Sequence, residues 1–316
     1  MGIMKRRYLK AFAGLLLITT CILCSMAVIG QTEDKGEGKS KGAKKPEIRT
    51  GKICITFDNL PAERSYEKLE RLWITDQLLD ALKKHEAPAA GFAVGENIEG
   101  GWELLVKWLE GGHTLGFMNF TGQDLNNVPA DIFIEDIGKG KEAIEDLVWS
   151  YKQKERYFRF AFLHYGSRPE IKRAVQDYLD ESLITVAHAS VVTEDFVYNL
   201  SLEKIMGSRD SLKFVALRDE YIDHILERLG SAETLAKEIM GRPIRHILQL
   251  RANRLNAMFL DDLLTVLEEK GYQFISLKEA LKDKVYRKEE AYFGNKGASY
   301  LERLKYSNPD LLPASD

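Results

Sequence analysis

Short apolar runs alternate with longer amphipathic stretches from Lys52 to Leu281. The apolar runs predict strands at 52–58, 88–94, 113–120, 156–162, 182–190, 245–251 and 272–277. The amphipathic stretches predict helices at 68–85, 102–111, 130–151, 168–180, 211–240 and 255–270. Because strands alternate with helices, the pattern predicts an α/β fold with a parallel sheet, either a barrel or a doubly wound sheet.

Polar residues gather directly after several of the predicted strands. They are Asp58 and Asn59, together with residues in the stretches 118–122, 159–166, 188–195 and 251–253. In parallel α/β folds the carboxyl ends of the strands meet at one edge, and functional sites lie there. We therefore expect these residues to surround a site at that edge.

Five segments in this order carry a resemblance to a known family. They are ITFDNLPA (55–62), GHTLGFMNFTGQDL (112–125), YFRFAFLHYG (157–166), TEDFVYN (193–199) and LRANRLNA (250–257). The chain from Lys52 to Leu281 resembles the polysaccharide deacetylases, the NodB-homology group of carbohydrate esterases. The resemblance implies a distorted, seven-stranded parallel (β/α) barrel that hydrolyses the acetamide C–N bond of N-acetylated glycans. It also implies a divalent metal, usually zinc, held by one aspartate and two histidines.

The family's metal-ligand positions carry other residues in this chain. Asp58 matches the catalytic base and Arg159 the arginine that supports it. Asn59 stands at the metal aspartate, and Met118 and Gly122 stand at the two histidines, with an i, i+4 spacing that would share one helical face. An amide oxygen, a thioether and a hydrogen do not suit zinc, which prefers carboxylate, imidazole or thiolate ligands. We therefore expect no cofactor, with zinc or another divalent metal only at a relocated site.

Other positions of the resemblance are also changed. Arg251 stands where the family has the histidine that protonates the leaving amine, and a guanidinium does not release a proton at workable pH. One hypothesis is that Arg251 and Arg159 both reach Asp58 and replace the charge of the metal; the alternative is that Arg251 points to solvent. The resemblance implies substrate contacts at Phe162, Tyr165, Asp195, Phe196 and Asn253.

A relocated metal site would need ligands from elsewhere in the chain. The candidates are His113, Asp124, His164 and His188. His113 and Asp124 are more readily explained as residues that hold a loop by hydrogen bonds, and His188 as a core histidine. His164 follows the arginine motif and could face Asp58, which leaves open a hydrolase without a metal.

The N-terminal sequence predicts export, and the composition of the chain predicts its division into parts. Lys5, Arg6 and Arg7 precede the uncharged stretch 11–30, so residues 1–30 are either a cleaved signal peptide or a retained membrane anchor. Residues 31–48 have the Gly, Lys and Glu composition of a flexible linker. The barrel is expected at 49–284 and a C-terminal extension at 285–316, which packs on the barrel. Only Cys54 lies beyond the signal, so no internal disulfide is expected.

Charge and location narrow the range of partners. The formal net charge of -3 excludes a general attraction to nucleic acid. The protein is expected to be periplasmic or extracellular, or membrane-attached through its N-terminus, with an acetylated glycan or cell-wall polysaccharide as its partner. Three functions remain: a non-catalytic or impaired deacetylase relative that binds glycan, an active hydrolase with relocated ligands or with Asp58 and His164, and a scaffold with a closed cleft.

Overall fold

A computed structural model describes residues 51–207 and 210–308. These residues belong to one compact unit, Pro46–Asp316. The predicted signal or anchor at 1–30 and the predicted linker at 31–48 lie outside the described residues. Among the described residues, no helix is long and apolar enough to cross a membrane.

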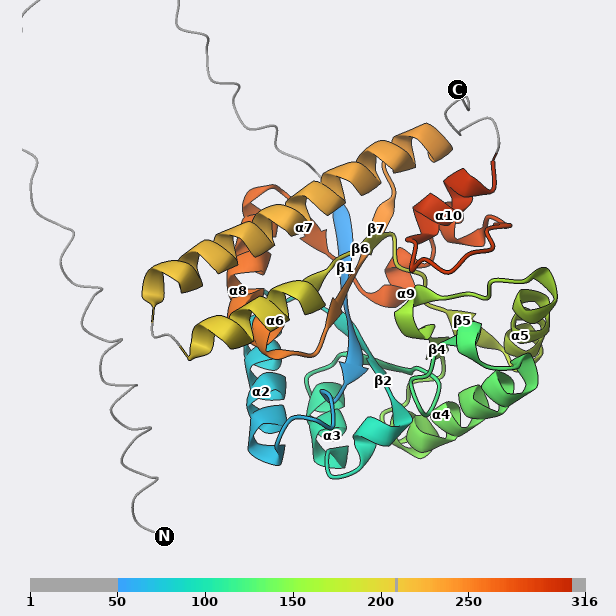
Figure 1. Cartoon of the computed structure of the whole chain (residues 1–316), viewed down its shortest axis with the longest axis horizontal. Helices are drawn as coiled ribbons and strands as arrows, with labels where there is room; N and C mark the ends of the chain where they lie inside the picture. The colour runs from blue at the N-terminus through green and yellow to red at the C-terminus, as the bar shows by residue number, and fades with distance from the viewer. Residues whose placement is uncertain (1–50, 208–209, 309–316) are drawn as a thin grey trace, which may run out of the picture. The chain divides into compact units, whose positions relative to one another are not determined.

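The centre of this unit is a curled, fully parallel sheet (Figure 1). Its strand order is β5-β4-β3-β2-β1-β7-β6, and β8 pairs with the first residues of β1. The strands are β1 (Lys52–Leu60), β2 (Ala89–Ala93), β3 (Thr114–Phe117), β4 (Arg156–Phe158), β5 (Ile184–Val186), β6 (Val191–Val192), β7 (Arg245–Arg251) and β8 (Gln273–Phe274). Within the described part of the chain no pairing joins β5 to β6, so the barrel is open there. The predicted parallel, distorted seven-stranded (β/α) barrel is thereby confirmed.

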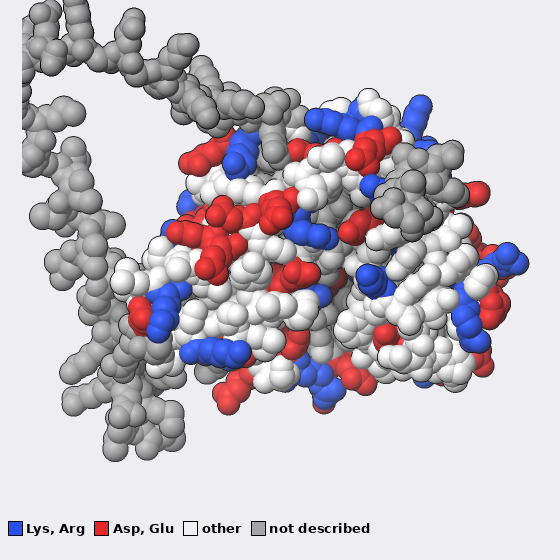
Figure 2. All heavy atoms as spheres, turned by 45° about the horizontal axis from the view of Figure 1, so that its top comes forward, with Lys and Arg blue, Asp and Glu red and all other residues white. Residues whose placement is uncertain are grey.

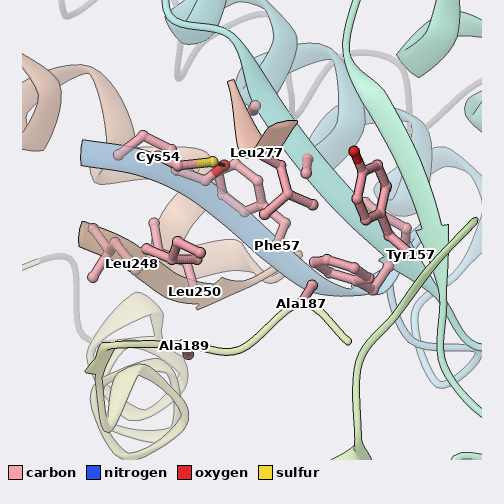
Figure 3. Close-up of a cluster of buried hydrophobic side chains, with 14 of the residues drawn as sticks. Cys54, Phe57, Tyr157, Ala187, Ala189, Leu248, Leu250 and Leu277 are labelled. Carbon is pink, nitrogen blue, oxygen red and sulfur yellow. Dashed lines mark hydrogen bonds between the residues drawn. The ribbon is translucent and has the colours of Figure 1, made fainter. Parts of the chain in front are cut away.

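Strand β1 is buried on both faces, as expected for the middle of a covered parallel sheet. Phe57 turns outward and packs edge-on against Trp108 of a covering helix, with 5.8 Å between ring centroids. Thr56 and Asp58, on the opposite face, both contact Arg159 inside the barrel. The free thiol of Cys54 is buried in the core (Figure 3), as predicted, and burial raises its pKa to about 12.

Helices cover the outer face of the sheet (Figure 1). They are α2 (Lys68–Lys84), α3 (Trp102–Glu110), α4 (Ala130–Ser150), α5 (Pro169–Glu181), α6 (Asp195–Met206), α7 (Ser211–Met240), α8 (Arg254–Glu269) and α9 (Leu277–Ala280). Short 3-10 turns lie at Gly95–Ile98, Leu125–Asn127, Ala161–Leu163 and Lys284–Arg287. On the face shown in Figure 2, basic and acidic side chains are interspersed, and acidic ones concentrate over α7.

The C-terminal extension packs on the barrel near its open seam. Helix α10 (Tyr300–Tyr306) contacts α7 and begins at a capping box formed by Ser299 and Glu302. The backbone N–H of Tyr300 donates to the carbonyl of Ala189, between β5 and β6, at 2.7 Å. Tyr300, Leu301 and Leu304 are buried in the main core. The extension therefore helps to build the wall of the barrel, as the expected packing on the barrel requires.

Candidate functional site

Asp58 lies at the carboxyl end of β1, inside the barrel. Its register partner on β7 is Arg251, and its Oδ2 accepts a 2.7 Å hydrogen bond from Gln249 Nε2. The other oxygen, Oδ1, is 3.5 Å from Arg159 Nη1, so the predicted contact between the base and its supporting arginine is present. Gln249 has no counterpart in the sequence motifs. It could have been found because it faces inward two residues before Arg251 on the same strand.

Arg159 is completely buried beneath Asp58. Its Nη2 donates to Thr56 Oγ1 at 3.1 Å, and its guanidinium lies 4.5 Å from the ring centre of Phe92. Asp58 Oδ1 and the Nε and Nη1 atoms of Arg159 have no hydrogen-bond partner among the described residues. Buried polar atoms of this kind are normally satisfied by water or by a ligand. These atoms are therefore where an internal water molecule would complete the hydrogen bonding of the pair.

Burial raises the pKa of the Asp58 carboxyl above its ordinary value, and both Arg159 and the Gln249 hydrogen bond act against this rise. Burial disfavours the charged carboxylate because it removes water, while the guanidinium favours it. A raised pKa suits a group that exchanges a proton, and the retained Arg159 keeps part of the negative charge stable. This pair keeps the electrostatics of a general base.

The residues at the three metal positions do not form a metal site. Asn59 has a left-handed backbone (φ 65°), and its Nδ2 lies 3.4 Å from Glu63 Oε1. Met118 is buried, and Gly122 lies in a turn with φ 69°, where a Cβ would approach Val94 to 3.2 Å. The stretch 118–122 is not helical, so the expected shared helical face is wrong. Among residues 51–207 and 210–308, no cluster of three His, Cys, Asp or Glu side chains could hold a metal.

Arg251 pairs with Asp195 and not with Asp58. Its Nη1 forms a short ion pair with Asp195 Oδ1, and its backbone N–H donates to Asp195 Oδ2 at 2.7 Å. Asn256 Nδ2 also donates to Asp195 Oδ2, at 2.8 Å, and Tyr221 donates to Asn256 Oδ1 at 2.5 Å. The hypothesis that Arg251 directly replaces the metal's contact to Asp58 is therefore wrong, and so is the alternative that it simply points to solvent. Its charge still lowers the pKa of the Asp58 carboxyl at longer range.

Three predicted substrate contacts have structural roles. Asp195 is fully buried as the partner of Arg251, and the Oδ1 of Asn253 accepts from the Asn256 N–H at 2.9 Å to cap α8. Tyr165 is buried beneath Arg303, whose guanidinium lies 3.3 Å from the ring centre. These groups contact neighbouring side chains or backbone in the structure, and their expected contact with a substrate stays a prediction.

Two aromatic side chains remain exposed beside the site. Phe196 is 49% exposed and lies 5.2 Å from the Arg251 guanidinium. Phe162 is 59% exposed and has a left-handed backbone with φ 56°, which a bulky residue rarely adopts. Exposed aromatic rings such as these are suited to stacking on a ligand, and the unusual backbone of Phe162 fixes the position of its ring.

The candidates for a relocated metal site form no group of three ligands among the described residues, although two of them lie together. His164 Nδ1 lies 2.9 Å from Asp124 Oδ1, although the atoms are not aligned as a hydrogen bond, and this pairing replaces the expected approach to Asp58. His113 precedes β3 at the opposite edge of the sheet and accepts from the Ala89 N–H at 3.3 Å. His188 Nδ1 contacts Tyr165 and Arg303. The explanation that His113, Asp124 and His188 hold local structure therefore fits their contacts.

Comparisons with known proteins agree with this geometry. The family model for polysaccharide deacetylase matches residues 45–178. The chain is 22% identical to the peptidoglycan-N-acetylglucosamine deacetylase PgdA of Listeria monocytogenes over 76% of this chain, but that alignment spans only 41% of PgdA. It is 24% identical to the peptidoglycan-N-acetylmuramic acid deacetylase PdaA of Bacillus subtilis, over 74% of this chain and 73% of PdaA.

Solved structures share the fold. The CE4 family pseudoenzyme BA3943 of Bacillus anthracis aligns with a TM-score of 0.50 at 16% identity, covering 74% of this chain and 66% of that one. The open parallel barrel is the fold that this chain shares with those structures. Residues 45–178 match the polysaccharide deacetylase family, and the fold is of the NodB-homology type. Members of this family are generally metal-dependent.

Proposed function

We propose that this protein is an exported cell-envelope member of the family that binds acetylated glycan and has lost most or all deacetylation. The observation that carries the proposal is the set Asn59, Met118 and Gly122 at the metal-ligand positions. A deacetylase of this type needs a Lewis acid to polarise the acetamide carbonyl and to activate water. One neutral amide and one thioether do not retain such a metal.

The proton donor has been lost as well. Arg251 stays charged at any workable pH, and its Nη1 is occupied by the buried Asp195. Asp58 and Arg159 remain, yet a base without an electrophile and without an acid supplies only a small part of the rate enhancement. Loss of these parts together supports impaired hydrolysis more strongly than any single substitution would.

Glycan binding is supported by what the site retains. The Asp58–Arg159 pair remains at the carboxyl edge of the sheet, where functional sites of parallel α/β folds lie, with 3.5 Å between Oδ1 and Nη1. Phe162 and Phe196 remain exposed nearby and offer flat apolar surfaces for sugar rings. Because PgdA and PdaA are peptidoglycan deacetylases, we propose an acetylated cell-wall glycan as the partner and the cell envelope as the location.

Metal content and activity test the proposal together. The purified protein is loaded with zinc, passed through a desalting column and analysed for bound metal, and then assayed for acetate release from N-acetylglucosamine oligomers. We expect no stoichiometric zinc and no acetate above the Asp58→Asn variant. A tightly bound metal with Asp58-dependent acetate release would show that the protein is an active deacetylase.

A second assay tests binding at the site. Phe162→Ala and Phe196→Ala each remove one exposed ring, and Trp149→Ala removes a 73% exposed ring from the end of α4 as a matched control. We expect the first two variants to retain less protein on insoluble peptidoglycan than the control does. Equal retention of all three would exclude these rings from glycan binding.

A further inference from the structure

A separate groove lies between α5 and the C-terminal extension. It has a volume of about 700 Å³, which is within the range of about 300–1,000 Å³ for small-molecule sites. Its lining includes Lys172, Arg173 and Gln176 of α5 together with Glu290 and Phe293 of the extension. Neither Asp58 nor Arg159 belongs to the lining, so this groove is distinct from the candidate site.

One wall of the groove contains His188 in a fixed orientation. Arg303 Nη2 donates to His188 Nδ1 at 3.0 Å, and the Tyr165 hydroxyl lies 3.3 Å from the same nitrogen. The imidazole stacks on Tyr300 with 4.2 Å between ring centroids and 17° between planes. Because a guanidinium can only donate, Nδ1 must accept, and the ring proton of the neutral histidine lies on Nε2. His188 thus offers a donor at a defined place in the groove wall.

The extension is fastened to α5 by a buried charge cluster. Glu290 Oε1 lies 2.6 Å from Lys172 Nζ and 3.0 Å from Arg303 Nη1. Lys172 Nζ also donates to the carbonyl of Tyr292 at 3.0 Å. The Glu290 side chain is only 8% exposed. These contacts hold the two sides of the groove at a fixed separation, so a ligand would meet a preformed surface.

The chemistry of the lining fits an uncharged, polyhydroxylated ligand. Its cationic and anionic side chains are equal in number, namely Lys172, Arg173, Arg287 and Lys288 against Asp177, Asp180, Glu289 and Glu290. A polyanion would meet these carboxylates, whereas sugar hydroxyls can bond to both kinds of group. Phe293 is 42% exposed and provides an apolar ring face. Hydrogen-bonding side chains beside the exposed ring of Phe293 form a suitable surface for pyranose rings.

We propose that this groove is a second glycan-binding site, for a neutral N-acetylhexosamine chain. The ligand class rests on the function proposed above, while the site and its residues are independent of it. A protein with two separate glycan sites would hold a polymer at two points, and simultaneous engagement strengthens attachment without any new contact.

Titration calorimetry with chitohexaose tests the proposal on the full-length protein. The groove variants are Phe293→Ala and Gln176→Ala, the candidate-site variant is Phe196→Ala, and Trp149→Ala is the control. Gln176 and Phe293 are exposed, so the fold should tolerate both changes, which thermal unfolding verifies. We expect two binding events for the wild type, and a weakening of one event by about five- to tenfold in Phe293→Ala, from loss of an aromatic contact, and in Gln176→Ala, from loss of a hydrogen bond.

The outcomes separate this proposal from the preceding one. If both groove variants bind like Trp149→Ala while Phe196→Ala weakens binding, the groove proposal is wrong and the candidate site is the binding site. If the groove variants weaken binding and Phe196→Ala does not, the groove proposal stands and binding at the candidate site fails. An absence of any binding of chitohexaose by the wild type overturns the groove proposal.

Discussion

Replacing Arg251 with alanine removes the only cation that forms an ion pair with the fully buried Asp195 among the residues that the structure describes. Asp195 is 0% exposed, and the Arg251 side chain is 21% exposed. After the change, Asp195 Oδ2 still accepts from the residue 251 N–H and from Asn256 Nδ2, whereas Oδ1 loses its partner. The variant therefore leaves a buried charge with part of its hydrogen bonding intact.

The size of the effect follows from that geometry. Removing one partner of a buried ion pair costs about 3–5 kcal/mol. Because two donors to Asp195 remain and Arg251 is partly exposed, we expect the lower end, a loss of about 3 kcal/mol in the free energy of unfolding. For a domain of this size, that corresponds to a fall in Tm of about 6–12 °C. A surface arginine gives a much smaller change, about 0–1 kcal/mol.

Urea unfolding of Arg251→Ala, Asp195→Asn, their double variant and a control variant measures this difference. Arg156→Ala is the matched control, since Arg156 pairs with Glu145 at 2.7 Å and both side chains are substantially exposed. The double variant Arg251→Ala with Asp195→Asn should be less destabilised than the sum of the single variants, because the neutral amide no longer needs the cation. If Arg251→Ala and Arg156→Ala lose the same stability, Asp195 does not depend on Arg251 and the reasoning is refuted.

Three further predictions concern buried ionisable side chains. Because the folded-state pKa of Asp58 is raised above its unfolded-state value, ionisation of Asp58 costs stability progressively as pH rises from the unfolded-state value to the folded-state value. Asp58→Asn should therefore gain stability relative to the wild type across that window, and the same pH dependence in both proteins would contradict this. Burial lowers the pKa of His113 and of His246 to about 4. The free energy of unfolding should therefore fall as pH drops from about 6.5 toward 4, by up to about 3 kcal/mol for each histidine. Replacing either histidine with glutamine should make the free energy of unfolding depend less on pH. Glu290→Gln should lower stability by about 3–5 kcal/mol because Lys172 and Arg303 lose their shared anion, and a thermal unfolding curve like that of Glu289→Gln would argue against this cluster.

The sequence predicted most of the fold because the covered parallel sheet has a strong pattern. Strand β7 and helices α2 and α7 match their expected ranges to within one residue. Helix α6 was not predicted, since it exposes Phe196, Val197 and Leu200 and so has no continuous apolar stripe. Strand β6 has only two residues and follows the predicted strand at 182–190 too closely to be distinguished from it.

The candidate site was predicted less completely than the fold. The motifs identified Asp58 and Arg159, which do meet, because the strand register brings them to one edge. The sequence did not indicate that Arg251 would form an ion pair with Asp195 rather than with Asp58. That choice depends on side-chain geometry, because Asp58 is its register neighbour while Asp195 begins the helix after β6. Arg303 lies in the extension, outside every motif, so only the three-dimensional packing reveals its contact with Tyr165.

Buried carboxylates of the barrel are offset by arginine and lysine side chains. In a metal-holding relative, a dication offsets carboxylates at this edge. Here Asp58 faces Arg159, Asp195 faces Arg251, and Glu290 lies between Lys172 and Arg303. Every one of these carboxylates has a permanent cation of the protein beside it. The charge of these carboxylates is thus offset by side chains of the protein itself, so their burial does not depend on a bound cation.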